Sequence, residues 1–525
     1  MNTHVSDIIP LPQRLLSNLI SRLNTSPSCL IAGAAMFLSY APFNLGWLCF
    51  LLILPLLIAC CHPNPDTRIF RGLLFGLGYF SVGSYWFAET LMEHIGYRWP
   101  AAIGGHLLIT GACALAPTTF CWLAGYFRSN EAKTHRRHRQ KVAWLVLLAA
   151  LWIVIEDIRF QAFGGGPWMS LALSQIDSPL RGFLPILGET GTSGMVIVVG
   201  QLLLYALTAA SQARISRAIG NCVFIGILMI TGGFLSSIEW TEASGEPLPV
   251  AIVQTAVSQA EKKNLSTQTE RLAQLSELSQ TYIGKANLII WPETMVTLNR
   301  GDIDQALKEF GKQAMLARST VLVGAYERSL NGRQFNTAFT LGYEAGQKYQ
   351  KRHLVPFGEY VPDYLWFLDE YVPGDQNRSL GREAMLIANS GVLFGVSICW
   401  EGSFSRDNTP LARAGAHVLV NIANEAWFAG SSLPQQNLDA MRVRALETGR
   451  PVIRVANYGP GAIINHNGKI TMPLEANIAS AATGMIQARI GSTPFVRLGA
   501  DFILLWSFGL VMIIGVIVRK ARTRL

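Results

Sequence analysis

Long runs of apolar residues limit the architectures open to this chain. Clear runs extend over 103–126, 142–158, 195–210, 219–235 and 502–518, and a run rich in Gly and aromatic residues covers 72–87. Two shorter runs, 29–41 and 45–61, are separated by Pro42. A helix needs about 17–25 mainly apolar residues to cross a bilayer. We therefore predict about eight membrane-spanning helices, in which the two short runs form one helix each.

The composition supports a membrane protein that also carries a globular part. The 525 residues are 50% hydrophobic and only 15% charged, and the mean hydropathy is +0.29. A soluble domain rarely has this balance. Glu156 and Arg159 lie at the end of one apolar run. Because a charge inside a bilayer is costly unless it is paired, we predict that they form a structural pair.

Basic residues predict the direction in which the chain crosses the membrane. With eight spans, the basic clusters all fall on one side: Arg68 and Arg71, residues 128–141, Arg214 and Arg217, and residues 519–524. The positive-inside rule then places both termini in the cytoplasm and residues 241–493 outside. The net charge of +9 is thus explained by topology, and we expect no nucleic-acid partner.

The pattern changes after residue 248. Short β-branched runs at 250–257, 287–291, 321–325, 391–399, 418–422 and 452–456 predict strands, and amphipathic stretches at 262–283, 303–317 and 437–448 predict helices. Alternating strands and helices favour sheets covered by helices. We predict three parts: a transmembrane bundle of about seven helices (1–240), an extracytoplasmic α/β catalytic domain (241–493), and a final transmembrane helix with a basic tail (494–525).

Cysteine usage singles out one residue. Only Cys399, of eight cysteines, lies within 241–493, so no disulfide can form inside that domain. No Cys/His spacing predicts a metal site. A lone thiol in an oxidising compartment is exposed to oxidation unless it is buried or has a function. A packed core cysteine at a strand end and a nucleophile are both open on this observation alone.

Three motifs place reactive residues at strand ends: LIIWPET with Glu293, YQKRHL with Lys351, and SICWEG with Cys399. A Cys nucleophile needs a base to take its proton, which Glu293 can supply. Lys351 and the backbone N–H of Trp400 can stabilise an oxyanion. Singly, Glu293 can be a helix cap or an ion-pair partner, and Lys351 a surface lysine. Together with the lone cysteine they favour a catalytic set.

These motifs resemble the apolipoprotein N-acyltransferase family. RALETGRPVIRVANYG (444–459) and TPFVRLG (493–499) resemble it too, as does the order of membrane bundle, outer domain and final helix. The resemblance implies a nitrilase-like α-β-β-α sandwich with a Glu–Lys–Cys triad, here Glu293 as base, Lys351 at the oxyanion and Cys399 as nucleophile. It further implies that assisting or substrate-binding residues lie near the site, namely Asn336, Glu359, Trp400, Glu401 and Trp427.

The chain also departs from the family pattern. The usual Tyr after the nucleophile is Trp400, and a Trp expected near the domain start is replaced by Lys262-Lys263-Asn264. A His expected before the RALE motif is Asn437. The triad is intact, so these departures bear on lipid and acceptor recognition.

The resemblance implies transfer of an acyl chain from a phospholipid, phosphatidylethanolamine, to the α-amine of the N-terminal diacylglyceryl-cysteine of apolipoproteins. The implied mechanism is a ping-pong reaction through a thioester, with no metal or cofactor. The implied setting is a monomer in a bacterial inner membrane with its catalytic domain in the periplasm. We expect the apolar loop 364–368 either to meet acyl chains as a lid or to pack on its own domain.

Three alternatives remain open at this point. One is a membrane-tethered amidase, or carbon-nitrogen hydrolase, that releases its acyl group to water. Another is a divergent acyltransferase with a different acceptor. The third is not an enzyme but a transporter or receptor with an outer binding domain, for which Cys399 would be dispensable.

Overall fold

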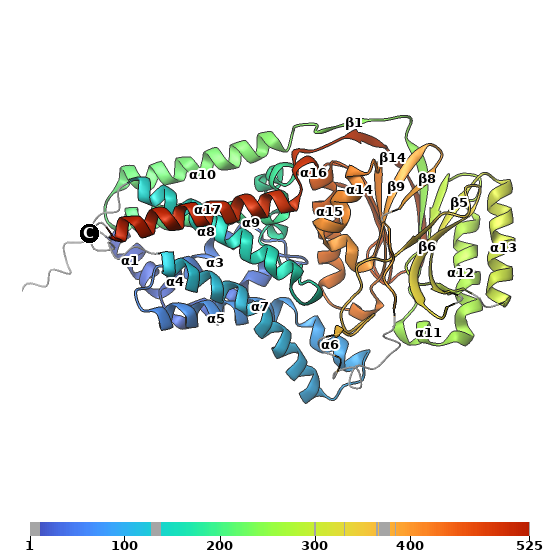
Figure 1. The fold of residues 1–525 in the computed structure, drawn as a ribbon, viewed down its shortest axis with the longest axis horizontal. Coiled ribbons are helices and arrows are strands. Elements are labelled where there is room, and N and C mark those ends of the chain that lie inside the picture. The colour runs from blue at the N-terminus through green and yellow to red at the C-terminus, as the bar shows by residue number, and fades with distance from the viewer. Residues whose placement is uncertain are drawn as a thin grey trace, which may run out of the picture. The chain divides into compact units, whose positions relative to one another are not determined.

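The computed structural model of the 525-residue chain describes residues 11–127, 138–298, 301–329, 331–363, 366, 378–383 and 385–523. Most of the predicted lid at 364–368 and most of the basic run 128–141 therefore lie outside the described residues. The chain forms two compact units. The first contains Met1–Phe87, Pro100–Ile238 and Asp501–Leu525, and the second contains Ala88–Trp99 and Glu239–Ala500. Figure 1 shows the helical elements of the first and the sheets of the second.

The first unit is built from helices. Its main helices are α1 (Leu11–Leu23), α2 (Ser26–Ala35), α3 (Leu48–Leu52), α4 (Leu54–Cys60), α5 (Pro65–Gly83), α7 (Trp99–Phe127), α8 (His138–Gln161), α9 (Leu184–Ser211), α10 (Ile215–Leu235) and α17 (Ala500–Thr523). The short helix α6 (Trp86–Glu93) precedes α7. Each predicted span thus coincides with helical structure.

Within the described residues, four helical segments are long and apolar enough to cross a membrane: Trp99–Phe127, Pro179–Ser211, Ile215–Leu235 and Ala500–Ile517. Ser26–Ser39 and Leu48–Cys60 are apolar but shorter. The other two predicted spans lie in α5, which carries Asp66, Arg68 and Arg71, and in α8, which ends in charged residues. The chain is a membrane protein, and the structure supports four spans by length and composition, which is fewer than the eight predicted.

The charged residues at the end of α8 are paired, as predicted. Arg159 Nη2 lies 3.9 Å from Glu156 Oε1, and both side chains are buried. The same oxygen accepts hydrogen bonds from Trp152 Nε1 and from the backbone N–H of Leu171, each at 3.3 Å. Glu156 therefore ties α8 to the segment that precedes α9, which is a structural role.

The second unit contains two sheets. The seven-stranded sheet has the order β14-β2-β3-β5-β6-β7, with β4 beside β5, and the six-stranded sheet has the order β13-β12-β11-β10-β9-β8. A further pair, β1 (Thr241–Ala243) and β15 (Arg489–Gly491), joins the two ends of the unit. The sheet strands are β2 (Leu248–Gln254), β3 (Leu288–Ile290), β4 (Val296–Thr297), β5 (Thr320–Arg328), β6 (Gln334–Gly342), β7 (Lys348–Gln350), β8 (Leu386–Asn389), β9 (Val392–Ile398), β10 (Val418–Asn424), β11 (Val452–Asn457), β12 (Ala462–Ile464), β13 (Ile470–Pro473) and β14 (Ser480–Ile486).

Alternation along the strands builds four layers. On β2, Val250 and Ile252 face a core between the two sheets, while Ala251 and Val253 face a second core on the outer side. Helices α12 (Gln268–Gln280) and α13 (Gly301–Leu316) supply apolar side chains to that outer core. Helices α14 (Ser405–Arg413) and α15 (Leu433–Thr448) do the same for the six-stranded sheet. The predicted α-β-β-α sandwich is confirmed for this unit (Figure 1).

Strand direction decides where polar residues gather. Strands β2, β3 and β5 are mutually parallel, as are β9, β10 and β11. Strand β6 is antiparallel to β5, and β7 is antiparallel to β6, so β7 runs in the direction of β5. The chain therefore leaves β3, β5 and β7 at one edge of their sheet, and Glu293 and Lys351 follow the first and last of these strands.

Candidate active site

Glu293 lies in a tight turn after β3. Its side chain is buried, and the next residue, Thr294, has a φ of 51°. Strand β5 approaches this turn closely, since a Cβ at Gly324 would lie 2.2 Å from the carbonyl oxygen of Pro292. A non-glycine residue in the left-handed region persists only where its surroundings hold it, and such residues often mark functional sites.

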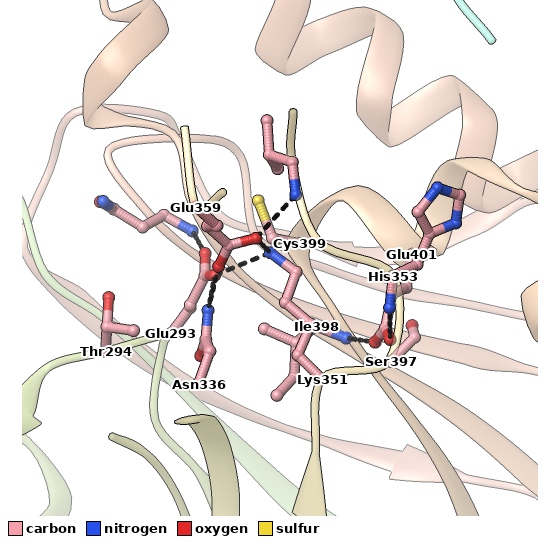
Figure 2. Close-up of polar contacts among 12 residues, drawn as sticks. Glu293, Thr294, Asn336, Lys351, His353, Glu359, Ser397, Ile398, Cys399 and Glu401 are labelled. Atoms are coloured by element: carbon pink, nitrogen blue, oxygen red, sulfur yellow. Dashed lines mark hydrogen bonds and ion pairs between the residues drawn. The ribbon is translucent and has the colours of Figure 1, made fainter. Parts of the chain in front are cut away.

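Lys351 lies between two carboxylates. Its Nζ is 2.8 Å from Glu359 Oε2 and 3.5 Å from Glu293 Oε1, and its side chain is 1% exposed (Figure 2). Burial lowers the pKa of Lys351, but the Glu359 and Glu293 carboxylates outweigh it and raise the pKa well above its ordinary value. Burial raises the pKa of Glu359, but the Lys351 ammonium outweighs burial and holds that pKa below its usual range. The ammonium and the Glu359 carboxylate are thus charged at neutral pH.

Neutral donors complete the binding of Glu293. Asn336 Nδ2 donates to Glu293 Oε1 at 2.7 Å and to Glu359 Oε1 at 3.0 Å. The backbone N–H of Asn424, at the end of β10, donates to Glu293 Oε2 at 2.7 Å. The two sheets therefore meet at this carboxylate, and both its oxygens have fixed directions.

Cys399 begins the turn η8 (Cys399–Ser403) directly after β9 and has a φ of 54°. Its side chain is partly exposed and lies beside Lys351 and Glu359 (Figure 2), and the thiol interacts electrostatically with both and with Glu293. Burial first, and the Glu293 carboxylate second, raise the pKa of the Cys399 thiol well above its ordinary value, although Lys351 opposes them. The resting sulfur is therefore a protonated thiol, and it becomes a nucleophile only if a base removes its proton.

Glu401 connects the Lys351 segment to the Cys399 turn. Its Oε1 accepts from the Tyr349 hydroxyl at 2.8 Å and from the backbone N–H groups of Arg352 and His353 at 2.7 and 3.1 Å. Its Oε2 accepts from the N–H of Ile398 at 2.7 Å. Glu401 is fully buried and all four donors belong to the protein, so this carboxylate anchors the Cys399 turn to the Lys351 segment.

We expect Glu401→Gln to destabilise this turn. The glutamine can present only one oxygen, so its NH₂ group would face the N–H of Ile398 and leave that donor unpaired. An unpaired buried donor costs roughly 1–3 kcal/mol. Thermal unfolding should show the loss, and peptide-resolved mass spectrometry should show a changed rate of Cys399 alkylation by iodoacetamide. Glu309→Gln is the control, because this side chain is 53% exposed, and a surface ion pair is worth at most about 1 kcal/mol. Equal effects of the two substitutions would contradict the anchor role.

The two predicted tryptophans follow strand ends: Trp400 comes directly after Cys399, and Trp427 lies in the short helix η9 (Ala426–Phe428) after β10. The Trp400 ring packs edge-on to Phe404, with centroids 5.3 Å apart. The Trp427 ring meets His94 edge-on at 6.0 Å, and Thr90 Oγ1 donates to the Trp427 carbonyl oxygen at 3.0 Å. Thr90 and His94 belong to the segment Ala88–Trp99 of the same unit. Sequence patterns did not indicate that this distant segment holds Trp427.

Asn437 takes part in a partly buried hydrogen-bond network that ends at the backbone carbonyl of Cys399. Its Nδ2 donates to Glu425 Oε1 at 2.7 Å, and Glu425 forms an ion pair with Arg454. Arg454 Nη1 donates to Asn421 Oδ1 at 2.9 Å, and Asn421 Nδ2 donates to the carbonyl oxygen of Cys399 at 3.2 Å. Three side chains therefore link Asn437 to the Cys399 turn.

Sequence reasoning did not predict Lys262 as a site residue. Its Nζ donates to the carbonyl oxygen of Glu293 at 2.9 Å and to the Thr294 hydroxyl. A lysine in a short polar stretch carries no pattern that distinguishes it from surface lysines.

Taken together, these groups suit acyl transfer. The site contains a thiol, a carboxylate with fixed orientation, and a buried ammonium that can stabilise negative charge on a carbonyl oxygen. Among the described residues, no group of His, Cys, Asp or Glu side chains is arranged to hold a metal ion.

Comparisons with known proteins agree with this chemistry. Residues 32–202 match the family "Apolipoprotein N-acyltransferase N-terminal domain", and residues 249–495 match "Carbon-nitrogen hydrolase". The apolipoprotein N-acyltransferase of Chromobacterium violaceum is 32% identical over 487 residues, which cover 89% of this chain and 89% of that protein. The proteins of that name from Methylococcus capsulatus and Nitrosomonas europaea are each 30% identical, and the alignments cover 90% and 86% of this chain and 92% and 88% of theirs.

Among solved structures, a Saccharomyces cerevisiae member of branch 10 of the nitrilase superfamily aligns with 47% of this chain and 93% of its own, at 16% identity and a TM-score of 0.37. The full-length relatives are decisive, since they match both the helical unit and the sandwich. This chain belongs to the apolipoprotein N-acyltransferase family.

Proposed function

We propose that this protein transfers an acyl chain from a phospholipid to the α-amine of the N-terminal diacylglyceryl-cysteine of apolipoproteins. The observation that carries the proposal is the Lys351 ammonium, held 2.8 and 3.5 Å from two carboxylates beside the Cys399 thiol. It occurs in a chain whose relatives over about nine-tenths of its length are named apolipoprotein N-acyltransferases.

In the first half-reaction, Cys399 Sγ attacks the sn-1 ester carbonyl of the phospholipid while Glu293 takes the thiol proton. Lys351, helped by the backbone N–H of Trp400, stabilises the oxyanion of the tetrahedral intermediate. The intermediate collapses to a thioester. The leaving lysophospholipid oxygen takes the proton back from Glu293.

In the second half-reaction, the neutral α-amine of the acceptor attacks the thioester carbonyl. Glu293 accepts a proton from the amine, the carbon–sulfur bond breaks, and the proton returns to Cys399. The products are an amide and the free thiol, so atoms and charge balance. A thioester suits this step because it reacts readily with amines and survives where water is excluded.

The remaining site residues assist these steps. Asn336 and Glu359 hold the charges of Glu293 and Lys351 in place, and Glu401 holds the Cys399 turn. Trp400 and Trp427 border the space where the two lipid substrates bind. Their large apolar surfaces suit acyl chains.

The proposal includes a membrane topology. Eight spans, counting α5, α8 and the short helices near residues 29–61, put the basic clusters on one side. Both termini then lie in the cytoplasm, and the catalytic domain 241–493 lies in the periplasm of a bacterial inner-membrane protein. It is flanked by the bundle 1–240 and the final helix 494–525. Because both substrates are membrane-anchored, we propose that a monomer suffices.

The test is intact-mass analysis of the full-length protein with phosphatidylethanolamine that carries a labelled sn-1 chain. We expect a mass gain of one acyl chain, which a synthetic diacylglyceryl-cysteine peptide then removes as an N-acyl product. An otherwise identical N-acetylated peptide should leave the acyl-enzyme intact, because it has no free amine.

Each alternative predicts a different outcome. Release of labelled fatty acid without an amide product would identify a hydrolase. Acylation of the enzyme without transfer to this peptide, but with transfer to another amine, would identify a different acceptor. A folded protein that gains no acyl mass would contradict an enzymatic role and favour a transporter or receptor.

A further inference from the structure

Lys262 is a partly buried cation that the proposed mechanism does not use. It lies in helix α11 (Gln259–Lys263), whose first turn is fixed by a capping box in which Ser258 and Glu261 hydrogen-bond reciprocally. Arg271 Nη1 donates to the carbonyl oxygens of Glu261 and Asn264 and so holds the other end of the helix. Hydrogen bonds therefore fix both ends of the short helix that carries Lys262.

The Lys262 ammonium binds the turn formed by Glu293 and Thr294. It donates to the Glu293 carbonyl oxygen at 2.9 Å and to the Thr294 hydroxyl. These two contacts fix the Glu293–Thr294 turn, in which Thr294 has a left-handed φ of 51°. Keeping a non-glycine residue in this region costs of order 1–3 kcal/mol. Contacts that fix the turn therefore also fix the direction in which the Glu293 carboxylate points.

We propose that Lys262 is a positioning residue that acts through Glu293, because its ammonium group holds the Glu293–Thr294 turn in the conformation that directs the carboxylate toward Cys399. The inference rests on the proposed role of Glu293 as the base.

The protonation state of Lys262 gives the proposal a measurable signature. Burial lowers the pKa of Lys262 to about 7, and Arg271 and Lys351 add to this effect while Glu293 and Cys399 oppose it. An arginine at this position would keep its charge throughout the accessible range. The wild-type protein should therefore lose its ammonium as pH rises through about 7, and a Lys262→Arg protein should not.

The experiment compares the wild type with Lys262→Arg, Lys262→Met and the control Lys285→Met, an exposed lysine elsewhere in the unit. The readouts are the rate of Cys399 alkylation by iodoacetamide, resolved by peptide mass spectrometry, and the rate of acyl-enzyme formation. We expect Lys262→Met to slow acylation about 10- to 100-fold, as a misplaced catalytic group does. Its KM for phospholipid should stay unchanged, and Lys285→Met should match the wild type.

The pH profile separates the effect of the Lys262 charge from the effect of its side-chain packing. We expect the ratio of wild-type to Lys262→Arg acylation rates to fall as pH rises through about 7. A flat ratio, or wild-type rates in a folded Lys262→Met protein, would overturn the inference. If Lys262→Met does not fold, the Lys262→Arg comparison alone decides. Absence of an acyl-enzyme in the wild type would instead refute the proposed function, and the alkylation rates would still test Lys262.

Discussion

Replacing Cys399 with alanine is expected to abolish the acyl-enzyme and to lower acyl transfer by about 10⁴-fold or more, since loss of a covalent nucleophile removes the reaction path itself. The effect should appear in both half-reactions, because the amine in the second step attacks the thioester formed in the first. Intact-mass analysis after incubation with phospholipid measures the first, and product analysis with the lipopeptide measures the second.

Two comparisons sharpen this result. Cys222→Ala, at an exposed position in α10, should acylate like the wild type. Cys399→Ser should fold and leave little acyl-enzyme, because a hydroxyl is a far weaker nucleophile at neutral pH than a thiol that a base can deprotonate. An acyl mass gain that persists in Cys399→Ala would show that another residue is acylated, and the triad proposed here would be wrong.

The sequence predicts the strands that are buried on both faces. The runs at 250–257, 287–291, 321–325, 391–399, 418–422 and 452–456 correspond to β2, β3, β5, β9, β10 and β11. β-branched residues favour strands, and burial on both faces keeps these segments mainly apolar despite single polar residues such as Asn421 and Arg454. The predictions did not include β6, with Asn336 and Thr337, or β14, which contains Ser480, two alanines and Gly484. Pairing with neighbouring strands decides those segments, and local propensity is too weak to show it.

Some residues of the site can likewise be recognised from the sequence, and others cannot. Glu293, Lys351 and Cys399 are recognisable because their motifs combine a buried strand with a reactive residue, and the structure brings Glu293 within 3.5 Å of Lys351. Their catalytic roles remain predictions. Lys262 escapes such reasoning because its partner is a backbone carbonyl, and a carbonyl carries no residue type that a sequence pattern can show. The approach of Thr90 to Trp427 joins positions too distant in the chain for any local pattern.

The membrane half shows a different limit. Apolar runs locate its helices, but charged residues in α5 and at the end of α8 lower the mean hydropathy that marks a span. The pairing of Glu156 with Arg159 shows why such a segment can still lie in a bilayer, since a paired charge is far less costly there than a single one. In the proposed eight-span topology, α5 and α8 would be spans that length and composition do not mark.

Lys351→Met is expected to have the second large effect, and it acts on both stability and rate. The lysine side chain is 1% exposed and forms ion pairs with two carboxylates. Removing one partner of a buried ion pair typically costs 3–5 kcal/mol, because the remaining charge stays buried and unpaired. Loss of the oxyanion-stabilising cation should also slow acylation about 10²- to 10³-fold. Chemical denaturation and acyl-enzyme formation measure the two effects separately.

A charge-matched double substitution distinguishes the effect on stability from the effect on the acylation rate. Lys351→Met with Glu359→Gln removes one positive and one negative charge, so the site keeps its net charge and most of the lost stability should return. The rate should not return, because no cation faces the oxyanion. The destabilisation of Lys351→Met alone should shrink as pH falls, since protonation relieves the repulsion between Glu293 and Glu359. In the wild type, by contrast, the lowered pKa of Glu359 means that its contribution to stability is lost in acid. Recovery of both stability and rate in the double variant would show that Lys351 has only a structural role.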